Sequence, residues 1–92
     1  MQFDWDRGKA ASNRRKHGIA FEDATGVFAD PHAAIFADPD HSLLEHREII
    51  VGKTQNMLLV VSFTERQDTI SVSLVHAAHR RESESVMKKT TR

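Results

Sequence analysis

The sequence predicts an α+β fold, in which an antiparallel sheet has two N-terminal helices and a C-terminal helix packed on it. Helical signals lie between residues 6 and 30, whereas three short segments rich in β-branched residues follow between positions 47 and 76. Helices grouped before a run of strands with short turns favour this class over an alternating α/β arrangement. The chain has 92 residues, so we expect a single domain over residues 1–92.

The N-terminal elements are a short strand and a helix. Residues 1–5 are expected to be extended. Asp6 can cap a helix over residues 7–17, because its side chain can accept a hydrogen bond from a backbone N–H of the first turn. Gly18 can end this helix, since glycine readily adopts the left-handed conformation after the last turn.

A second helix is predicted over residues 20–28, and Asp30-Pro31 ends it. Its apolar residues recur at three- and four-residue spacing and therefore form one buried stripe. We expect the core between the helices and the sheet to contain Trp5, Phe21, Ala24 and Phe28.

The remaining elements are strands and a final helix. Strands are predicted where short segments have apolar or β-branched centres, which are residues 32–37, 47–52, 57–64 and 69–76. The segment 57–64 is the most apolar, so we expect it to be the central strand. Polar turns are expected at residues 38–42, 53–56 and 65–68. The charged segment from residue 78 through residue 87 is predicted to form the C-terminal helix.

The composition excludes several classes of protein and site. The chain has no cysteine, which excludes disulfides, thiolate nucleophiles and cysteine zinc sites. It has no apolar run near the roughly 20 residues that a membrane-spanning helix needs. Its first residues lack the apolar stretch of a signal peptide. We therefore expect a cytoplasmic protein without a membrane partner.

Charge is segregated along the chain, although the formal net charge is zero. Residues 1–18 hold five cations and two acids, residues 19–52 one cation and seven acids, and residues 78–92 five cations and two acids, which gives +3, −6 and +3. This distribution favours one face for an anion and another for a basic partner. Solvated faces that segregate by chance would have the same composition.

A metal site is an alternative with little support in the spacing. His41 and His46 lie near Asp38, Asp40 and Glu45 in a polar loop, but this spacing lacks the ligand geometry that zinc requires. The sequence has no H-E-x-x-H pair, no glycine-rich phosphate loop and no nucleophile elbow. We expect no metal and no cofactor.

Acid–base groups and arginines gather late in the chain. Glu65 and His76 are candidate proton-transfer groups. Arg66, Arg80 and Arg81 are candidate phosphate ligands, because the planar, charged fork of arginine suits phosphoryl oxygens. These groups fit RNA cleavage without a metal, in which a 2′-hydroxyl attacks the adjacent phosphorus and expels the 5′-oxygen. Further candidates for RNA binding are Lys53, Lys88 and Lys89.

Each of these residues also has an ordinary structural interpretation. Glu65-Arg66 can be a polar hairpin turn, His76 a strand end, and Arg80-Arg81 part of a solvated helix start. A hairpin also places residue 65 beside the turn and residue 76 at the far end, so simple pairing does not bring them together.

The sequence resembles the BrnT family of toxins over nearly its whole length. The opening pattern is F-D-W-D-x-x-K-A-x-x-N-x-x-K-H-G-I-x-F-E-D-A-x-x-V-F-x-D-P, from Phe3 to Pro31. Later matches are D-P-D-H-S from Asp38, E-x-R-x-x-x-x-G from Glu45, Thr64-Glu65-Arg66, and A-x-R-R-E from Ala78.

The resemblance implies a RelE-like fold and a ribonuclease toxin that inhibits translation and growth. It implies functional roles for Glu65, Arg66, Arg80 and Arg81. It also implies a cognate BrnA-type antitoxin that neutralises the toxin in a 2:2 heterotetramer. Operator DNA would then be bound only through the antitoxin.

One departure from the family pattern leaves a second function open. Family members carry arginine in an A-R-x-A stretch where this chain has Val75-His76-Ala77-Ala78. His76 can substitute as a phosphate ligand or proton-transfer group, or it can mark a weakened toxin. The alternative function is therefore a catalytically weakened toxin-fold protein that binds an antitoxin in operon autoregulation.

Overall fold

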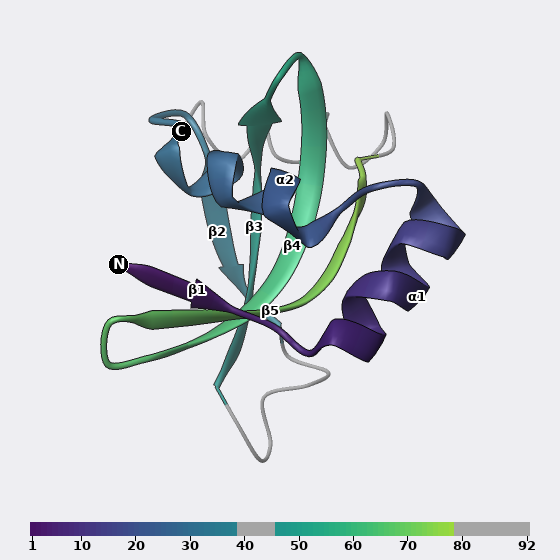
Figure 1. Ribbon diagram of the computed structural model, residues 1–92. Helices are drawn as coiled ribbons and strands as arrows, with labels where there is room; N and C mark the ends of the chain where they lie inside the picture. The colour runs from purple at the N-terminus through teal and green to yellow at the C-terminus, as the bar shows by residue number, and fades with distance from the viewer. Residues whose placement is uncertain (39–45, 79–92) are drawn as a thin grey trace.

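In the part of the chain that the structure describes, two α-helices and a 3-10 helix lie between the first and second strands of a five-stranded sheet. The computed structural model describes residues 1–38 and 46–78 (Figure 1). The elements are β1 (Gln2–Asp4), α1 (Arg7–His17), α2 (Phe21–Ala24), the 3-10 helix η1 (Thr25–Ala29), β2 (Ala34–Ala37), β3 (Arg47–Thr54), β4 (Met57–Arg66) and β5 (Thr69–Ala77). The strand order is β1-β5-β4-β3-β2, which confirms that the most apolar strand is central. The fold is α+β, as predicted.

The sheet is mixed, so the prediction of an antiparallel sheet is wrong for one strand. β2, β3, β4 and β5 form an antiparallel meander, but β1 runs parallel to β5 with Gln2 opposite Thr69. Short turns fix the direction of consecutive strands. The pairing of β1 with β5 joins distant parts of the chain and has no turn to reveal it in the sequence.

Two tight turns set the register of the meander. Gln55 and Asn56 join β3 to β4 with φ values of 50° and 66°, the two positive values that a type I′ hairpin turn requires. Gln67 and Asp68 join β4 to β5, and Gln67 has a φ of 55°. The prediction of a turn over residues 65–68 is therefore too long, because β4 continues through Arg66.

The predicted helix over residues 20–28 is instead two short elements. α2 ends at Ala24, and η1 continues to Ala29 as a 3-10 helix. Thr25 and Gly26 have low helix propensity, and the Thr25 hydroxyl donates to the Glu22 carbonyl (2.8 Å). The tighter 3-10 winding lets Gly26 lie directly against Thr54 of β3, where a Cβ atom would clash.

Two other predictions lie outside the described residues. The predicted C-terminal helix begins at Ala78, which is described as irregular chain, and its remainder falls in residues 79–92. Most of the predicted loop over residues 38–42 falls in residues 39–45. Within residues 1–38 and 46–78, no helix has the length and apolar character that a membrane span requires.

The hydrophobic core lies between the sheet and the short helices α2 and η1 (Figure 1). Phe21 and Ala24 are fully buried, while Trp5 and Phe28 are partly buried and pack against the core. The ring of Phe28 lies edge-on to Phe63 of β4, with 4.9 Å between centroids. The four predicted core residues are therefore confirmed.

The core defines two faces of the sheet. Side chains alternate along β4, so Leu59, Val61 and Phe63 share the helix-covered face. Thr64 and Arg66 lie on the opposite face, which also bears Arg47 through its pairing with Thr64.

α1 stands beside β5 at the edge of the sheet (Figure 1). Its ends follow the prediction: the Asp6 carboxylate accepts from the Lys9 N–H (2.8 Å), and Gly18 has a φ of 70°. In the middle of α1, Asn13 is 4% exposed. Its Nδ2 donates to the Ile19 carbonyl (3.1 Å), and its Oδ1 accepts from the Val75 N–H (3.0 Å).

The Asn13 carboxamide hydrogen-bonds to a part of the β5 edge with which β1 does not pair. β1 pairs with β5 at Thr69, Ile70 and Ser71, so within the described chain no strand lies beside the outer edge of β5 at Val75. Asn13 takes the place of a strand at that point. It thereby fixes the position of α1 along β5.

A second polar contact joins η1 to β3. The Asp30 carboxylate accepts from the His32 N–H (2.9 Å) and from the Lys53 N–H (2.7 Å). The hydrogen bond from Lys53 lowers the pKa of Asp30 most, and the one from His32 lowers it further, so this pKa lies below its ordinary value. Gly52 allows the close approach, because a Cβ there would lie 2.9 Å from the Ala33 Cβ.

We expect Asn13→Ala to lower the free energy of unfolding by about 2–4 kcal/mol. Two buried backbone groups would each lose a partner, at roughly 1–3 kcal/mol apiece, and the higher helix propensity of alanine returns at most about 0.7 kcal/mol. Urea denaturation measures the change. The control is Arg15→Ala, an exposed change on the same helix that should stay within about 0.5 kcal/mol of wild type. Equal stability of the two variants would contradict this role for Asn13.

We expect the stabilising contribution of Asp30 to depend on pH. Because the pKa is lowered in the folded state, the contribution is fully present above the unfolded value of 3.8 and is lost as the pH falls through the folded value. Urea midpoints of wild type and Asp30→Asn should differ at pH 7 and converge toward pH 2. Asp68→Asn, in an exposed turn, is the control. A difference that stayed constant over this range would show that the charge of Asp30 is irrelevant.

Candidate functional site

Glu65 and Arg66 are the last two residues of β4 and point to opposite faces of the sheet. Both are exposed. Glu65 shares the helix-covered face with Phe63, whereas Arg66 shares the opposite face with Thr64. The two neighbours in sequence therefore do not meet at one ligand.

His76 and Lys53 lie at the other end of the sheet. Arg66 pairs with Thr69, and His76 lies seven residues further along β5. At about 3.3 Å per residue, roughly 23 Å of strand separates them. Lys53 pairs with Leu58, at the far end of β4 from Arg66. The structure does not bring Glu65, Arg66 and His76 together.

Four predicted site residues, Arg80, Arg81, Lys88 and Lys89, lie outside the described residues. The described chain ends at Ala78, whose N–H donates to the Leu58 carbonyl (2.9 Å). Of the metal alternative, His41 also lies outside, and the His46 Nε2 lies 3.9 Å from a Glu48 carboxylate oxygen. Among residues 1–38 and 46–78, no group of three or more metal-ligating side chains is close enough to hold an ion.

Arg66 and other cationic side chains line one pocket on the sheet face opposite α2. The pocket has a volume of about 220 Å³ and is lined by Asp6, Lys9, Arg47, Thr64, Arg66, Ser71, Val72 and Ser73. We call it the arginine pocket. Arg47, Thr64 and Ser71 lie in one row across β3, β4 and β5, so the sheet register itself forms its floor.

The arginine pocket suits an anion. Three cationic side chains, Lys9, Arg47 and Arg66, line it against the one carboxylate of Asp6. Arg47 is partly buried, and burial strengthens the attraction between a guanidinium and an anion because fewer water molecules screen it. The Ser71 hydroxyl donates to the Asp4 carboxylate (2.6 Å) and is therefore held in place. The arrangement can hold a phosphate group and stabilise negative charge on its oxygens.

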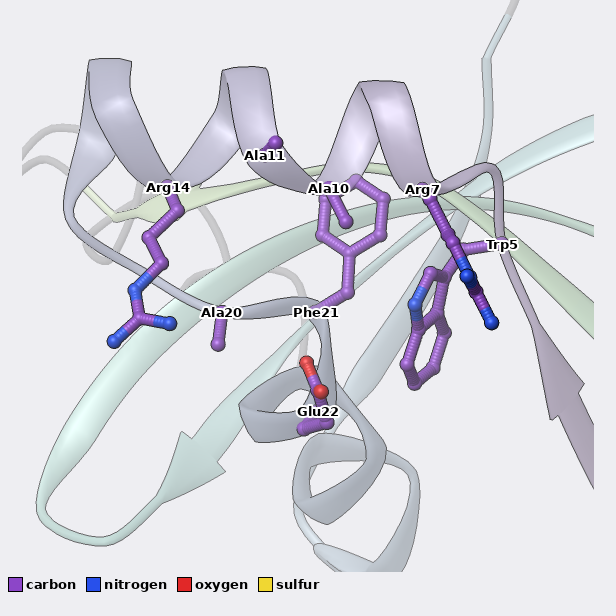
Figure 2. Close-up of a pocket in the computed structure, with 8 residues that line it drawn as sticks. All are labelled: Trp5, Arg7, Ala10, Ala11, Arg14, Ala20, Phe21 and Glu22. Atoms are coloured by element: carbon purple, nitrogen blue, oxygen red, sulfur yellow. The ribbon is translucent and has the colours of Figure 1, made fainter.

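A larger hollow on the other side of α1 does not bring its cationic side chains together at one point. It has a volume of about 360 Å³, between α1 and α2, and includes Trp5, Phe21 and Glu22. Figure 2 shows Arg7 and Arg14 at its two ends, with Ala10 and Phe21 between them. The two arginines are seven residues apart on α1, about 10.5 Å along the helix axis. The Trp5 ring packs against Phe21 at 6.0 Å, so the aromatic wall of this hollow belongs to the core.

Sequence reasoning identified Arg66 but missed Lys9 and Arg47 as its partners. Arg47 belongs to the E-x-R pattern that resembles the family, but this pattern does not reveal its contact with the pocket, because Arg47 approaches Arg66 only through the pairing of β3 with β4. Lys9 approaches through the docking of α1 beside β5. Side chains alternate between the two faces along β4, so Thr64 and Arg66 share one face. If the pairing of Arg47 with Thr64 had been known, it would have placed Arg47 on that face as well.

Fold and pocket together define the class of protein: a small α+β protein whose sheet carries a pocket in which the charged side chains are mainly cationic. The family described as "Ribonuclease toxin, BrnT, of type II toxin-antitoxin system" matches residues 5–82 of the chain. The chain therefore belongs to the BrnT family of ribonuclease toxins, and a type II toxin has an antitoxin as its partner. A comparison with curated proteins gives no match.

Proposed function

We propose that this chain is a metal-independent endoribonuclease that holds the scissile phosphate of RNA in the arginine pocket. The observation that carries the proposal is the convergence of Lys9, Arg47 and Arg66 on one hollow of phosphate-binding chemistry. Family membership supports RNA as the substrate.

Cleavage would proceed by internal attack. The 2′-oxygen of the RNA loses its proton and bonds to the adjacent phosphorus, the bond from phosphorus to the 5′-oxygen breaks, and the 5′-oxygen takes a proton from water and leaves as a hydroxyl. A 2′,3′-cyclic phosphate remains. Negative charge grows on the phosphoryl oxygens as the new bond forms, and Arg47 and Arg66 stabilise that charge. Asp6 lines the pocket, and one of its carboxylate oxygens accepts the capping hydrogen bond of α1, so its other oxygen can accept the 2′-hydroxyl proton.

The other predicted site residues differ in the part that this proposal gives them. Arg80 and Arg81 remain predicted phosphate ligands from the segment after Ala78. Glu65 and His76 lie too far from Arg66, or on the wrong face, to act on the same phosphorus. Lys53, Lys88 and Lys89 remain predicted contacts to more distant RNA.

The proposal includes the antitoxin. We propose a BrnA-type antitoxin in a 2:2 heterotetramer that neutralises the toxin in the cytoplasm, prevents growth inhibition and alone contacts operator DNA. Glu22 and Asp23 on α2 lie across the sheet from the arginine pocket. These acids support a contact with a basic antitoxin surface that is separate from the RNA site.

The alternative is a weakened toxin that keeps antitoxin binding. His76 favours it, because the position at which the family carries arginine here bears an imidazole at the far end of β5 from Arg66.

We expect Arg66→Gln to lower the RNA cleavage rate of the purified chain by about 10²- to 10³-fold, the typical loss when one charge-stabilising donor is removed. Asp6→Asn should lower it too, since asparagine keeps the helix cap but cannot accept the proton. Cleavage of a labelled single-stranded RNA measures the rates.

Arg15→Gln is the matched control, because it removes one exposed cation outside the arginine pocket. Wild-type cleavage by Arg66→Gln would contradict the proposal. Growth and intact RNA on expression of the wild-type chain, with arrest on expression of His76→Arg, would favour the weakened toxin instead.

A further inference from the structure

A second hollow continues the arginine pocket along the seam between α1 and β5. It has a volume of about 200 Å³ and is lined by Lys9, Ser12, Asn13, Lys16, His17, Ser73 and Leu74. Lys9 and Ser73 line both hollows, so the two adjoin. We call the combined feature the seam groove.

The fold explains why a groove forms here. Because β1 ends at Asp4, α1 is the described element that lies along the rest of the outer edge of β5. The β4–β5 ladder has an irregularity at Ser62/Phe63, and the Ser73 hydroxyl donates to the Ser62 carbonyl (3.1 Å) at that point. A bulge bends the strand locally, and the irregularity lies at Ser73, one of the residues that line the hollow.

Cationic side chains line the seam groove along its length. Lys9 and Lys16 are seven residues apart and lie on the same side of α1 as the anchoring residue Asn13. His17 follows Lys16, and its ring lies 5.8 Å from the ring of His76 at the end of β5. The groove thus runs from the arginines of the pocket, past two lysines, to a pair of imidazoles. Asp6 of the pocket and Asp4 beside Ser71 are the acids at its arginine end.

We propose that the seam groove binds the single-stranded RNA that flanks the scissile phosphate, with Lys16 on a backbone phosphate and the His17–His76 pair against a base. This inference rests on the proposed function and adds a path for the substrate. Single-stranded RNA is recognised by cationic grooves that follow the backbone and by rings, histidine included, on which bases stack. The β5 residues that line the groove begin at Ser71, and His76 lies five residues further along the strand, roughly 17 Å at about 3.3 Å per residue, so there is room for at most about five nucleotides at 3.4 Å of rise each.

The proposal gives His76 a role at a distance from the reacting phosphorus. It would contact RNA several nucleotides from the phosphate at Arg66, which agrees with the strand register. A histidine in place of the family's arginine would then change how this part of the RNA is held, while the arginine pocket stays intact.

The test measures binding to RNA that cannot be cleaved. Labelled 2′-O-methyl oligouridylates of eight and three nucleotides lack the attacking hydroxyl, and fluorescence anisotropy at several salt concentrations gives their affinities. Lys16→Gln should weaken binding of the octamer about fivefold and make its salt dependence shallower by about 0.7 in log–log slope, the value for one lost phosphate contact on a single strand. Binding of the trimer should stay unchanged, because the arginine pocket is intact.

Arg15→Gln provides the matched control, since it removes an equal charge from the adjacent position without lining the groove. It should change octamer binding less than twofold, and circular dichroism verifies that both variants are folded. Equal effects of Lys16→Gln and Arg15→Gln would overturn the seam groove and leave the cleavage result for Arg66→Gln untouched. A normal cleavage rate for Arg66→Gln, with the Lys16 effect present, would instead refute the catalytic proposal and keep the groove.

Discussion

The side chain of Asn13 is the contact on which the arrangement of this molecule depends. It satisfies the Val75 N–H of β5 and the Ile19 carbonyl of the segment after α1, both in a buried position. A buried backbone group without a partner is costly, so α1 cannot slide along β5 without losing both hydrogen bonds. The same helix bears Lys9 and Lys16, so the residue that satisfies the sheet edge also positions the cations of the seam groove.

The second constraint is the register of the meander. Two-residue turns at Gln55-Asn56 and Gln67-Asp68 fix the pairing of consecutive strands. A shift of this pairing by one residue would move every side chain of a strand to the other face of the sheet. This register puts Arg47, Thr64 and Ser71 in one row. The apolar residues on the helix-covered face enforce it, because they must reach α2 and η1. Core packing on one face therefore determines which polar groups meet on the other.

Local signals in the sequence predicted much of the fold. The helix over residues 7–17, its Asp6 cap and its Gly18 end agree with the structure because each depends on residues within one turn. The parallel pairing of β1 and the partnership of Arg47 with Arg66 depend on contacts between distant segments, and no local pattern encodes them. Arg66 was predicted by its residue type and by resemblance to the family. Glu65, adjacent in sequence, faces the other way because of strand alternation.

Mapping of RNA onto the labelled protein tests the central claim most directly. In a titration of the ¹⁵N-labelled chain with the uncleavable octauridylate, amide chemical shifts report which residues the RNA approaches. The account predicts the largest changes at Lys9, Lys16, Thr64 and Ser73, which line the arginine pocket and the seam groove. Changes gathered instead around Trp5, Arg7 and Glu22, in the hollow of Figure 2, would contradict it.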